Sequence, residues 1–336
     1  MQGEPKAARV AFLVPYLGVW PRWCRLFFES CRTNPEVAII VLCESPPPFP
    51  LPANVHVVSM RRSEIIGRLE KVTGLNLGNL HGHKLSDLKP FYGLAFADML
   101  EKYQFWGFCD IDMMFGNLEK LFTDEFFDSI DVFSSHNEMI VGHFTVLRNT
   151  PAVNRLCFRI ESWKQLCLSP MAEHMDEQRF AEALRKDSSI RWKRSASLQE
   201  ELQGSFGRFG ITFTFFGEVA YLESADTPVV QWENGSVYYH DAAGKSTEVL
   251  YVHFMGLKHW WHWCLFDAKS FLQRTHCFSR IGYGDVSSAS ALHYFPWKQV
   301  YWVQTCLVRS KTGLGALLRK ALPSDVFLAL RRKLNV

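Results

Sequence analysis

Short apolar runs alternate with segments of helical periodicity over the first 110 or so residues, and this alternation limits the possible folds most strongly. The apolar runs cover residues 10–14, 37–43, 55–58 and 105–109, and the segments with apolar residues at helical spacing cover 20–32, 61–72 and 84–103. Strands that alternate with helices are typical of α/β proteins with a largely parallel sheet. Ligand sites in such proteins lie at the carboxyl ends of the strands.

The regular alternation ends after Asp112, where the pattern becomes mixed. We expect strands at 131–134, 143–148 and 249–255, helices at 153–166 and 178–184, and a hairpin over 229–239 because Asn234-Gly235 lies between apolar flanks. With 336 residues, 48% of them apolar, the chain can bury a substantial core. A weakly marked break predicts a main domain over residues 1–265 and a C-terminal extension over 266–336.

The charge of the chain is nearly balanced overall but concentrated at one end. The formal net charge is only +3, which disfavours a nucleic-acid-binding protein. Residues 309–336 hold seven Lys and Arg residues against Asp325 alone, so this segment carries +6. Leucines interleave with these basic residues and predict an amphipathic surface helix broken near Pro323. We expect any attraction to an anionic membrane surface to reside there, although a basic helix packed on the core is an equal alternative.

Cysteine usage and hydropathy indicate a cytoplasmic protein. The nine cysteines are scattered, odd in number and without a Cys-x-x-Cys pair, which favours a reducing compartment over a disulfide framework or a zinc knuckle. The first residues lack the charged start, apolar run and cleavage site of a secretory signal. No stretch approaches the roughly 20 apolar residues of a membrane-spanning helix. We therefore expect a cytoplasmic protein, with peripheral attachment to the inner face of the membrane through 309–336.

Two carboxylates directly follow the apolar run 105–109. Asp110 and Asp112 are spaced i and i+2, and in extended chain this spacing puts both side chains on one face. Two oxygen ligands side by side suit Mn²⁺ or Mg²⁺, which keep open positions for phosphate oxygens. The alternative is a solvated turn, because Asp is favoured in turns for its own hydrogen bonds.

Several sequence blocks combine charged, aromatic and glycine residues in an unusual order. The long blocks cover residues 14–23, 84–93 and 105–117, and shorter ones are Gly142-His143-Phe144, Asp176-Glu177-Gln178, Trp232-Glu233-Asn234-Gly235 and Tyr251-Val252-His253-Phe254. In these blocks the chain resembles a bacterial family of glycosyltransferase-like proteins associated with surface polysaccharide (capsule or lipopolysaccharide) biosynthesis. That family belongs with the wider GT-A nucleotide-sugar transferases, and the resemblance spans about residues 9–260.

The resemblance implies a GT-A-like fold for residues 1–265, with a metal site beneath the diphosphate of a nucleotide-sugar donor. Asp112 would be a direct metal ligand, Asp110 would face the sugar or ribose side of the metal, and His253 would complete the coordination. The residue type and its setting agree with this role of His253, because an imidazole on an apolar strand can supply a neutral nitrogen ligand. A packed histidine bonded to the backbone is the alternative for His253.

Further residues are candidates for the donor site. Asp87 and the cations Lys84 and Lys89 lie at the start of a predicted helix and match donor-contacting positions of related transferases, although Asp87 also suits a helix cap. Tyr16 is a candidate at the nucleotide base, with core packing as the alternative. Lys258 is a candidate point charge for the departing diphosphate, although a surface lysine is the default.

A transferase also needs a base for the acceptor hydroxyl or a site that supports front-side attack. Asp176 and Glu177 are the candidate catalytic residues, because they resemble an element that precedes a helix in several nucleotide-sugar transferases. A carboxylate at a helix start is also stabilised by the helix dipole, so a cap is the alternative for Asp176.

Together these features predict a metal-dependent glycosyltransferase that moves a sugar from a nucleotide-sugar donor, with a UDP-sugar as the first choice, to a glycan or lipid-linked acceptor. Two alternatives stay open. A non-catalytic polysaccharide-assembly factor would keep the fold and be indifferent to metal. A haloacid-dehalogenase-type phosphatase would use the first Asp as nucleophile, but that pattern normally lies near the start of the chain.

Overall fold

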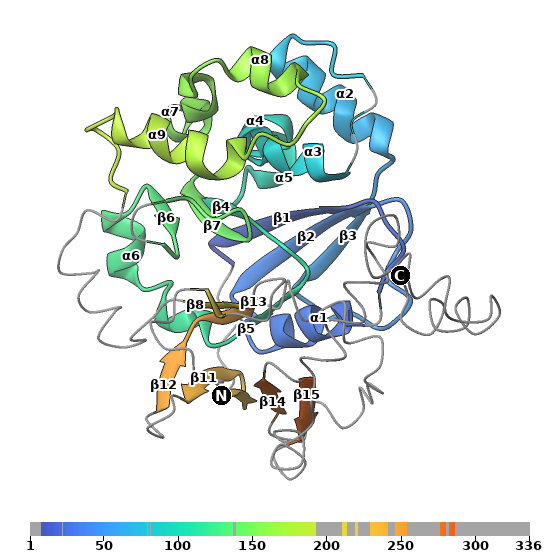
Figure 1. Ribbon diagram of the computed structural model, residues 1–336, viewed down its shortest axis with the longest axis vertical. Helices are drawn as coiled ribbons and strands as arrows, with labels where there is room; N and C mark the ends of the chain where they lie inside the picture. The colour runs from blue at the N-terminus through green and yellow to red at the C-terminus, as the bar shows by residue number, and fades with distance from the viewer. Residues whose placement is uncertain are drawn as a thin grey trace, which may run out of the picture.

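A six-stranded sheet forms the centre of the computed structural model, which describes residues 8–21, 23–78, 80, 82–136, 139–192, 210–213, 219–220, 229–240, 246–253, 276–279 and 282–285 (Figure 1). Its strands are β1 (Val10–Tyr16), β2 (Val37–Cys43), β3 (Val55–Ser59), β4 (Phe105–Cys109), β6 (Val132–Ser134) and β7 (Phe144–Arg148). They run in the order β3-β2-β1-β4-β7-β6. All four strands predicted in the first 110 residues are therefore present, and all four lie in this sheet.

The first four strands are parallel to one another, and β7 is antiparallel to both β4 and β6. Pairing of Val10 with Phe105 and of Leu13 with Phe108 aligns the carboxyl ends of β1 and β4 at one edge. Every residue of β2 and β4 is buried, as expected for strands covered on both faces. This mixed, mostly parallel sheet flanked by helices confirms the fold class predicted from the sequence.

Helices cover both faces of the sheet. The α-helices are α1 (Cys24–Arg32), α2 (Arg62–Thr73), α3 (Gly82–Asp87), α4 (Tyr92–Ala95), α5 (Ala97–Leu100), α6 (Asp124–Ser129), α7 (Pro151–Asn154), α8 (Trp163–Leu168) and α9 (Phe180–Arg185). Alternate residues of β1 point to opposite faces. Phe12 joins the core cluster that includes α1, and Leu13 joins the cluster that includes α2 and α4, so β1 contributes to both halves of the core.

The predicted helix over 84–103 is wrong as a continuous helix. The chain instead forms α3, the 3₁₀ turn η1 (Lys89–Phe91), α4 and α5. Pro90 has no N–H for the helical ladder, which favours a break at this point. At Gly93, a Cβ atom would lie 2.5 Å from the Trp106 ring, so the segment packs closely on β4. The predicted helix over 153–166 is also divided, into α7, the 3₁₀ helix η3 (Arg155–Arg159) and α8, with Ser162 in a left-handed conformation.

Two smaller sheets complete the described structure. One has the order β5-β13-β8-β9, formed by β5 (Met113–Phe115), β13 (Tyr251–His253), β8 (Gly210–Phe213) and β9 (Val219–Ala220). The other has the order β12-β11-β10-β14-β15, formed by β12 (Ser246–Val249), β11 (Ser236–His240), β10 (Val229–Glu233), β14 (His276–Ser279) and β15 (Gly282–Asp285). Figure 1 shows both below the central sheet, on the side of α1.

The hairpin predicted from Asn234-Gly235 is confirmed, since β10 and β11 pair across this turn. Both turn residues have positive φ, 50° and 84°, as a two-residue hairpin turn requires. The strand predicted over 249–255 is divided at Leu250 into the end of β12 and the whole of β13. Residues 254 and 255 lie outside the described part of the chain.

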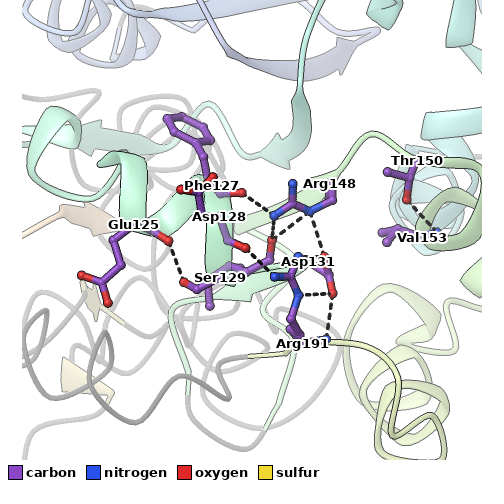
Figure 2. Close-up of polar contacts among 10 residues, drawn as sticks. Glu125, Phe127, Asp128, Ser129, Asp131, Arg148, Thr150, Val153 and Arg191 are labelled. Atoms are coloured by element: carbon purple, nitrogen blue, oxygen red, sulfur yellow. Dashed lines mark hydrogen bonds and ion pairs between the residues drawn. The ribbon is translucent and has the colours of Figure 1, made fainter.

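An ion network of Asp131, Arg148 and Arg191 attaches the start of β6 to the segment that follows α9. Asp131 accepts hydrogen bonds from Arg148 Nε at 2.8 Å and from Arg191 Nε and Nη2 at 2.9 and 2.7 Å (Figure 2). The two guanidinium groups also donate to backbone carbonyls at the end of α6, including that of Ile130 at 2.7 Å. Cations at a helix C-terminus satisfy its unpaired carbonyls. The network therefore joins α6, β6, β7 and residue 191.

Among the described residues, no helix is both long enough and apolar enough to cross a membrane. Of the predicted C-terminal extension 266–336, the structure describes only β14 and β15. The predicted amphipathic segment 309–336 lies outside the described residues, so its helical character and membrane contact stay predictions.

Gly107, in the middle of β4, leaves no room for a larger residue. A Cβ atom there would lie 2.5 Å from the backbone oxygen of Thr145 and 2.8 Å from the Phe12 ring. We expect Gly107→Ala to lower the free energy of unfolding by about 2 kcal/mol, because the neighbouring strand must move. Gly67→Ala is the matched control: it lies in α2 with nothing within 4 Å of its Cβ position, and should stabilise the protein by roughly 0.5–1 kcal/mol. Urea denaturation measures the free energy of unfolding of both variants. Equal changes in the two variants would contradict the tight packing around Gly107 in β4.

Candidate metal centre and its surroundings

The two carboxylates of the Asp-x-Asp motif lie where β4 ends. The chain leaves β4 at Cys109, passes through Asp110 and Asp112, and enters β5 at Met113. The side chain of Asp110 is 39% exposed, whereas that of Asp112 is 6% exposed. The motif lies beside the end of β1. From β1 the chain continues to β2 and β3 on one side, whereas β4 lies on the other side, so β1 and β4 flank the topological switch point of the sheet. Ligands bind at such switch points in open α/β sheets.

His253 is brought to this position by the four-stranded sheet β5-β13-β8-β9. Strand β13 is antiparallel to β5, and the register pairs His253 with Met113, the residue after Asp112. His253 Nε2 lies 3.3 Å from Asp112 Oδ1, and both side chains are buried. One potential ligand atom each from Asp110, Asp112 and His253 lies within 4.8 Å of the other two. The three residues predicted as metal ligands are thus together in space.

The chemistry of these groups suits a divalent cation. Neither ring nitrogen of the buried His253 has a hydrogen-bond partner within the described part of the chain. Buried polar atoms are normally satisfied, and each exception calls for an explanation. A ring nitrogen that binds a metal would be satisfied by it, and two carboxylate oxygens beside an imidazole form a ligand set found for such ions. Asp110, Asp112 and His253 could therefore hold a metal ion.

Lys89 is the buried cation of the site. Its Nζ donates to Asp110 Oδ1 and to the Gly142 carbonyl oxygen, each at 2.8 Å, and lies 3.7 Å from Asp176 Oδ2. Burial by itself would lower the pKa of Lys89, but the carboxylates of Asp110 and Asp176 outweigh it and raise that pKa above its usual value. The ammonium group therefore stays charged and holds Asp110 in one orientation.

Asp176 and Glu177 lie in the π-helix η4 (Met175–Arg179), and both contact Gly142, whose carbonyl oxygen accepts from Lys89. Glu177 Oε1 accepts a hydrogen bond from the Gly142 N–H at 3.1 Å, and a Cβ atom on Gly142 would lie 2.7 Å from Asp176 Oδ2. Burial raises the pKa of Asp176 to about 7, partly opposed by Lys89 and reinforced by Glu177. Such a carboxyl group can exchange a proton near neutral pH. A larger residue at Gly142 would require the Asp176 carboxylate to move.

Lys84 and Asp87 form a separate buried pair. Lys84 Nζ lies 3.0 Å from Asp87 Oδ2 and donates to the backbone carbonyl of Met171 at 3.0 Å. Asp87 accepts from the backbone N–H groups of Glu173 and Met175 at 2.7 and 3.4 Å. The pair therefore attaches α3 to the loop that leads into η4, and the carboxylate and ammonium groups are bonded to protein rather than presented at the metal centre.

Tyr16 lies at the end of β1 beside the metal centre. Its hydroxyl donates to the Val19 carbonyl at 2.9 Å, and its ring is 4.3 Å from the Trp20 ring, centroid to centroid. Burial, and then the nearby Cys24 and Asp112, raise the pKa of its phenol. Lys258, the remaining candidate, lies outside the described residues.

Sequence reasoning missed three residues that the structure brings to the site, namely Gly142, His143 and Tyr251. His143 stacks on His253, with ring centroids 4.2 Å apart, and its Nε2 lies 2.9 Å from the Tyr251 hydroxyl. Burial and the neighbouring His253 lower the pKa of His143 well below its usual value, so the ring is neutral at pH 7. All three residues stand in blocks that carry the resemblance, but their spacing in the sequence does not predict their contacts.

The buried Lys84–Asp87 pair predicts a large stability effect. Lys84→Met removes the cation and leaves a buried carboxylate that keeps only its backbone donors, so we expect the free energy of unfolding to fall by about 3 kcal/mol. Lys186→Met breaks the exposed pair with Glu161 and should leave stability unchanged within error. Urea denaturation of both variants measures the difference, and similar losses would contradict the importance of burial.

The raised pKa of Asp176 predicts a pH dependence of stability. Because the folded protein holds this proton more tightly than the unfolded chain, the contribution of Asp176 favours folding below about pH 4 and is lost as the pH rises through about 7. We expect Asp176→Asn to gain stability relative to the wild type between about pH 4 and pH 8. Chemical denaturation across this pH range measures the difference in free energy of unfolding between the variant and the wild type. A difference that does not change with pH would show that Asp176 ionises normally.

Comparison with known proteins gives one family and a number of similar solved structures, of which two are described here. No curated protein matches the chain. The apo form of mouse xyloside xylosyltransferase 1 has 10% sequence identity and a TM-score of 0.35, with 56% of this chain and 84% of that chain covered. Galactosyltransferase LgtC in complex with donor and acceptor sugar analogues has 10% identity and a TM-score of 0.37, with 78% of this chain and 91% of that chain covered. The model of a family of unknown function, DUF6625, matches residues 12–274. Because this match covers most of the chain, the protein belongs to the DUF6625 family.

Proposed function

We propose that the protein is a metal-dependent glycosyltransferase that moves a sugar from a nucleotide-sugar donor to a glycan or lipid-linked acceptor in bacterial surface polysaccharide synthesis. A UDP-sugar is the first choice of donor. The observation that carries the proposal is the convergence of Asp110, Asp112 and His253 at the carboxyl edge of the central sheet, with potential ligand atoms within 4.8 Å of one another. The family resemblance of the sequence blocks around these residues supports the same reaction.

Asp110, Asp112 and His253 hold the cation in this proposal. Mn²⁺ or Mg²⁺ bound there would neutralise the negative charge of the donor's diphosphate as it leaves. The greater exposure of Asp110 supports contact between its outer oxygen and the sugar or ribose of the donor. Asp112 and His253 are both buried and serve the metal alone.

Lys89 acts as a positioning residue in this proposal rather than as a cation that faces the diphosphate. Its three oxygen neighbours already belong to the protein, and its bond to Asp110 fixes the carboxylate that reaches solvent. Lys84 and Asp87 act one step further out, because they hold the loop that carries Asp176 and Glu177. Tyr16 and Lys258 remain candidates for the nucleotide base and the departing diphosphate.

Asp176 and Glu177 are the proposed source of general-base catalysis toward the acceptor hydroxyl. The pKa of Asp176, raised to about 7, suits proton exchange near neutral pH. Glu177 is more exposed, at 32% of its side chain, and its Oε1 is held by the Gly142 N–H. Because the two carboxyl groups lie at one glycine, a base at either position would act close to Asp110.

The proposed setting is the cytoplasmic side of the membrane, with residues 309–336 as the peripheral dock. This segment would bring the site to lipid-linked acceptors through its +6 charge. Removal of 309–336 tests the dock separately from the chemistry, by partitioning onto anionic vesicles.

Thermal unfolding in the presence of candidate donors tests the proposal. We expect one of the UDP-, GDP-, CMP- and dTDP-sugars to raise the melting temperature with Mn²⁺ and not with a chelator, because a ligand that binds only the native state stabilises it. Asp112→Asn should abolish this shift, and should lower transfer or donor hydrolysis at least about 100-fold. Glu101→Gln, an exposed carboxylate away from the motif, is the control and should behave as the wild type.

The outcomes separate the alternatives. A metal-independent protein in which Asp112→Asn changes nothing would contradict the proposal and favour an assembly factor. Release of phosphate from simple phosphate esters, lost in Asp110→Asn, would favour a phosphatase that uses Asp110 as nucleophile.

A further inference from the structure

Within the described residues, no hydrogen bond fixes the orientation of the His253 ring. A histidine that binds a metal usually donates its second ring N–H to a carboxylate, a carbonyl or water, and this bond fixes the ring. Neither nitrogen of His253 has a hydrogen-bond partner in the part of the chain that the structure describes. Asp112 Oδ1 lies 3.3 Å from Nε2, but Asp112 is itself a candidate ligand. Among the described residues, the contact that restrains the ring is therefore of another kind.

The face of the His253 ring is covered by His143. The two ring centroids are 4.2 Å apart and the planes are inclined by 22°, which is a stacked arrangement. Both side chains are almost fully buried, at 4% and 6% exposure for the two residues. A ring stacked on one face keeps that contact only near two χ2 values half a turn apart, because any other rotation would lose the contact or enter the neighbouring ring. Stacking on His143 thus restricts the direction of the His253 nitrogens.

His143 is fixed in turn by groups on the same small sheet and on the loop after β6. Its Nε2 lies 2.9 Å from the hydroxyl of Tyr251, which precedes His253 by two residues on β13 and therefore lies on the same face. The Tyr251 hydroxyl also bonds to Ser135 Oγ. A hydrogen-bonded series from Ser135 through Tyr251 to His143 ends at the stacked face of His253.

His143 does not share the ligand role. The described group of ligand atoms within 4.8 Å of one another contains Asp110, Asp112 and His253 and not His143. The Nε2 atom of His143 is engaged by Tyr251. What His143 offers to the metal centre is the flat face of its ring.

We propose that His143 is a positioning residue of the metal centre, which orients the ligand His253 by the stacking of its ring face. This inference rests on the proposed metal site. It adds a residue that binds neither metal nor substrate and yet sets the affinity for the cation.

Mn²⁺ binding to the purified full chain, measured by isothermal titration calorimetry and by electron paramagnetic resonance of free Mn²⁺, tests the inference. The matched variants are His143→Phe and His143→Leu, which both fill the space and both lose the bond to Tyr251, while only Phe keeps a flat aromatic face. We expect His143→Phe to bind Mn²⁺ within about threefold of the wild type, and His143→Leu to bind at least about tenfold more weakly. Melting of the metal-free variants should be alike, which verifies the fold.

Equal Mn²⁺ affinity in His143→Leu and the wild type overturns the positioning role alone, because the metal site is then intact without it. Equal loss in the Phe and Leu variants, with the fold preserved, also overturns it, because a ring nitrogen and not the ring face is then required. Failure of the wild type itself to bind Mn²⁺ would overturn the proposed function and this inference together.

Discussion

The burial of β4 between β1 and β7 is the constraint on which the site depends. This strand is covered on both faces, and its glycine at position 107 allows the Thr145 backbone and the Phe12 ring to approach it closely. It is also where the sheet changes from parallel to antiparallel pairing. A strand confined in this way has one register, so the two carboxylates that follow it emerge at one fixed point on the edge of the sheet.

Around that point the protein arranges charge in two layers. The inner layer is the ammonium group of Lys89, surrounded by oxygens of Asp110, Asp176 and Gly142. The outer layer is the carboxylate pair with His253, open to solvent through Asp110. A buried cation without such partners would be costly, and so would buried carboxylates without a cation. The two layers therefore depend on each other, and the conformation of η4 links them to the Gly142 backbone.

Local sequence signals predicted what is decided locally. The four apolar runs became strands because they are short and rich in β-branched and aromatic residues, which favours a strand over a helix. Asn234 and Gly235 formed the hairpin turn because both tolerate positive φ. The predicted helix over 84–103 was wrong for a non-local reason as well as a local one, since the contact of Gly93 with Trp106 on β4 reinforces the break at Pro90. The hydrophobic periodicity of a segment carries no information about the neighbouring segment on which it packs.

Local patterns of residues were enough to predict the α/β class, the Asp-x-Asp pair at the end of a strand, and the order of the elements that precede it. His253 was identified through a family resemblance, since the residues alone left a packed histidine as an alternative. Three contacts were found only in the folded chain: β13 pairs with β5, Lys89 donates to Asp110, and His143 stacks on His253. Dihedral preferences and hydrophobic periodicity act over a few residues, whereas these contacts depend on which distant segments are buried side by side.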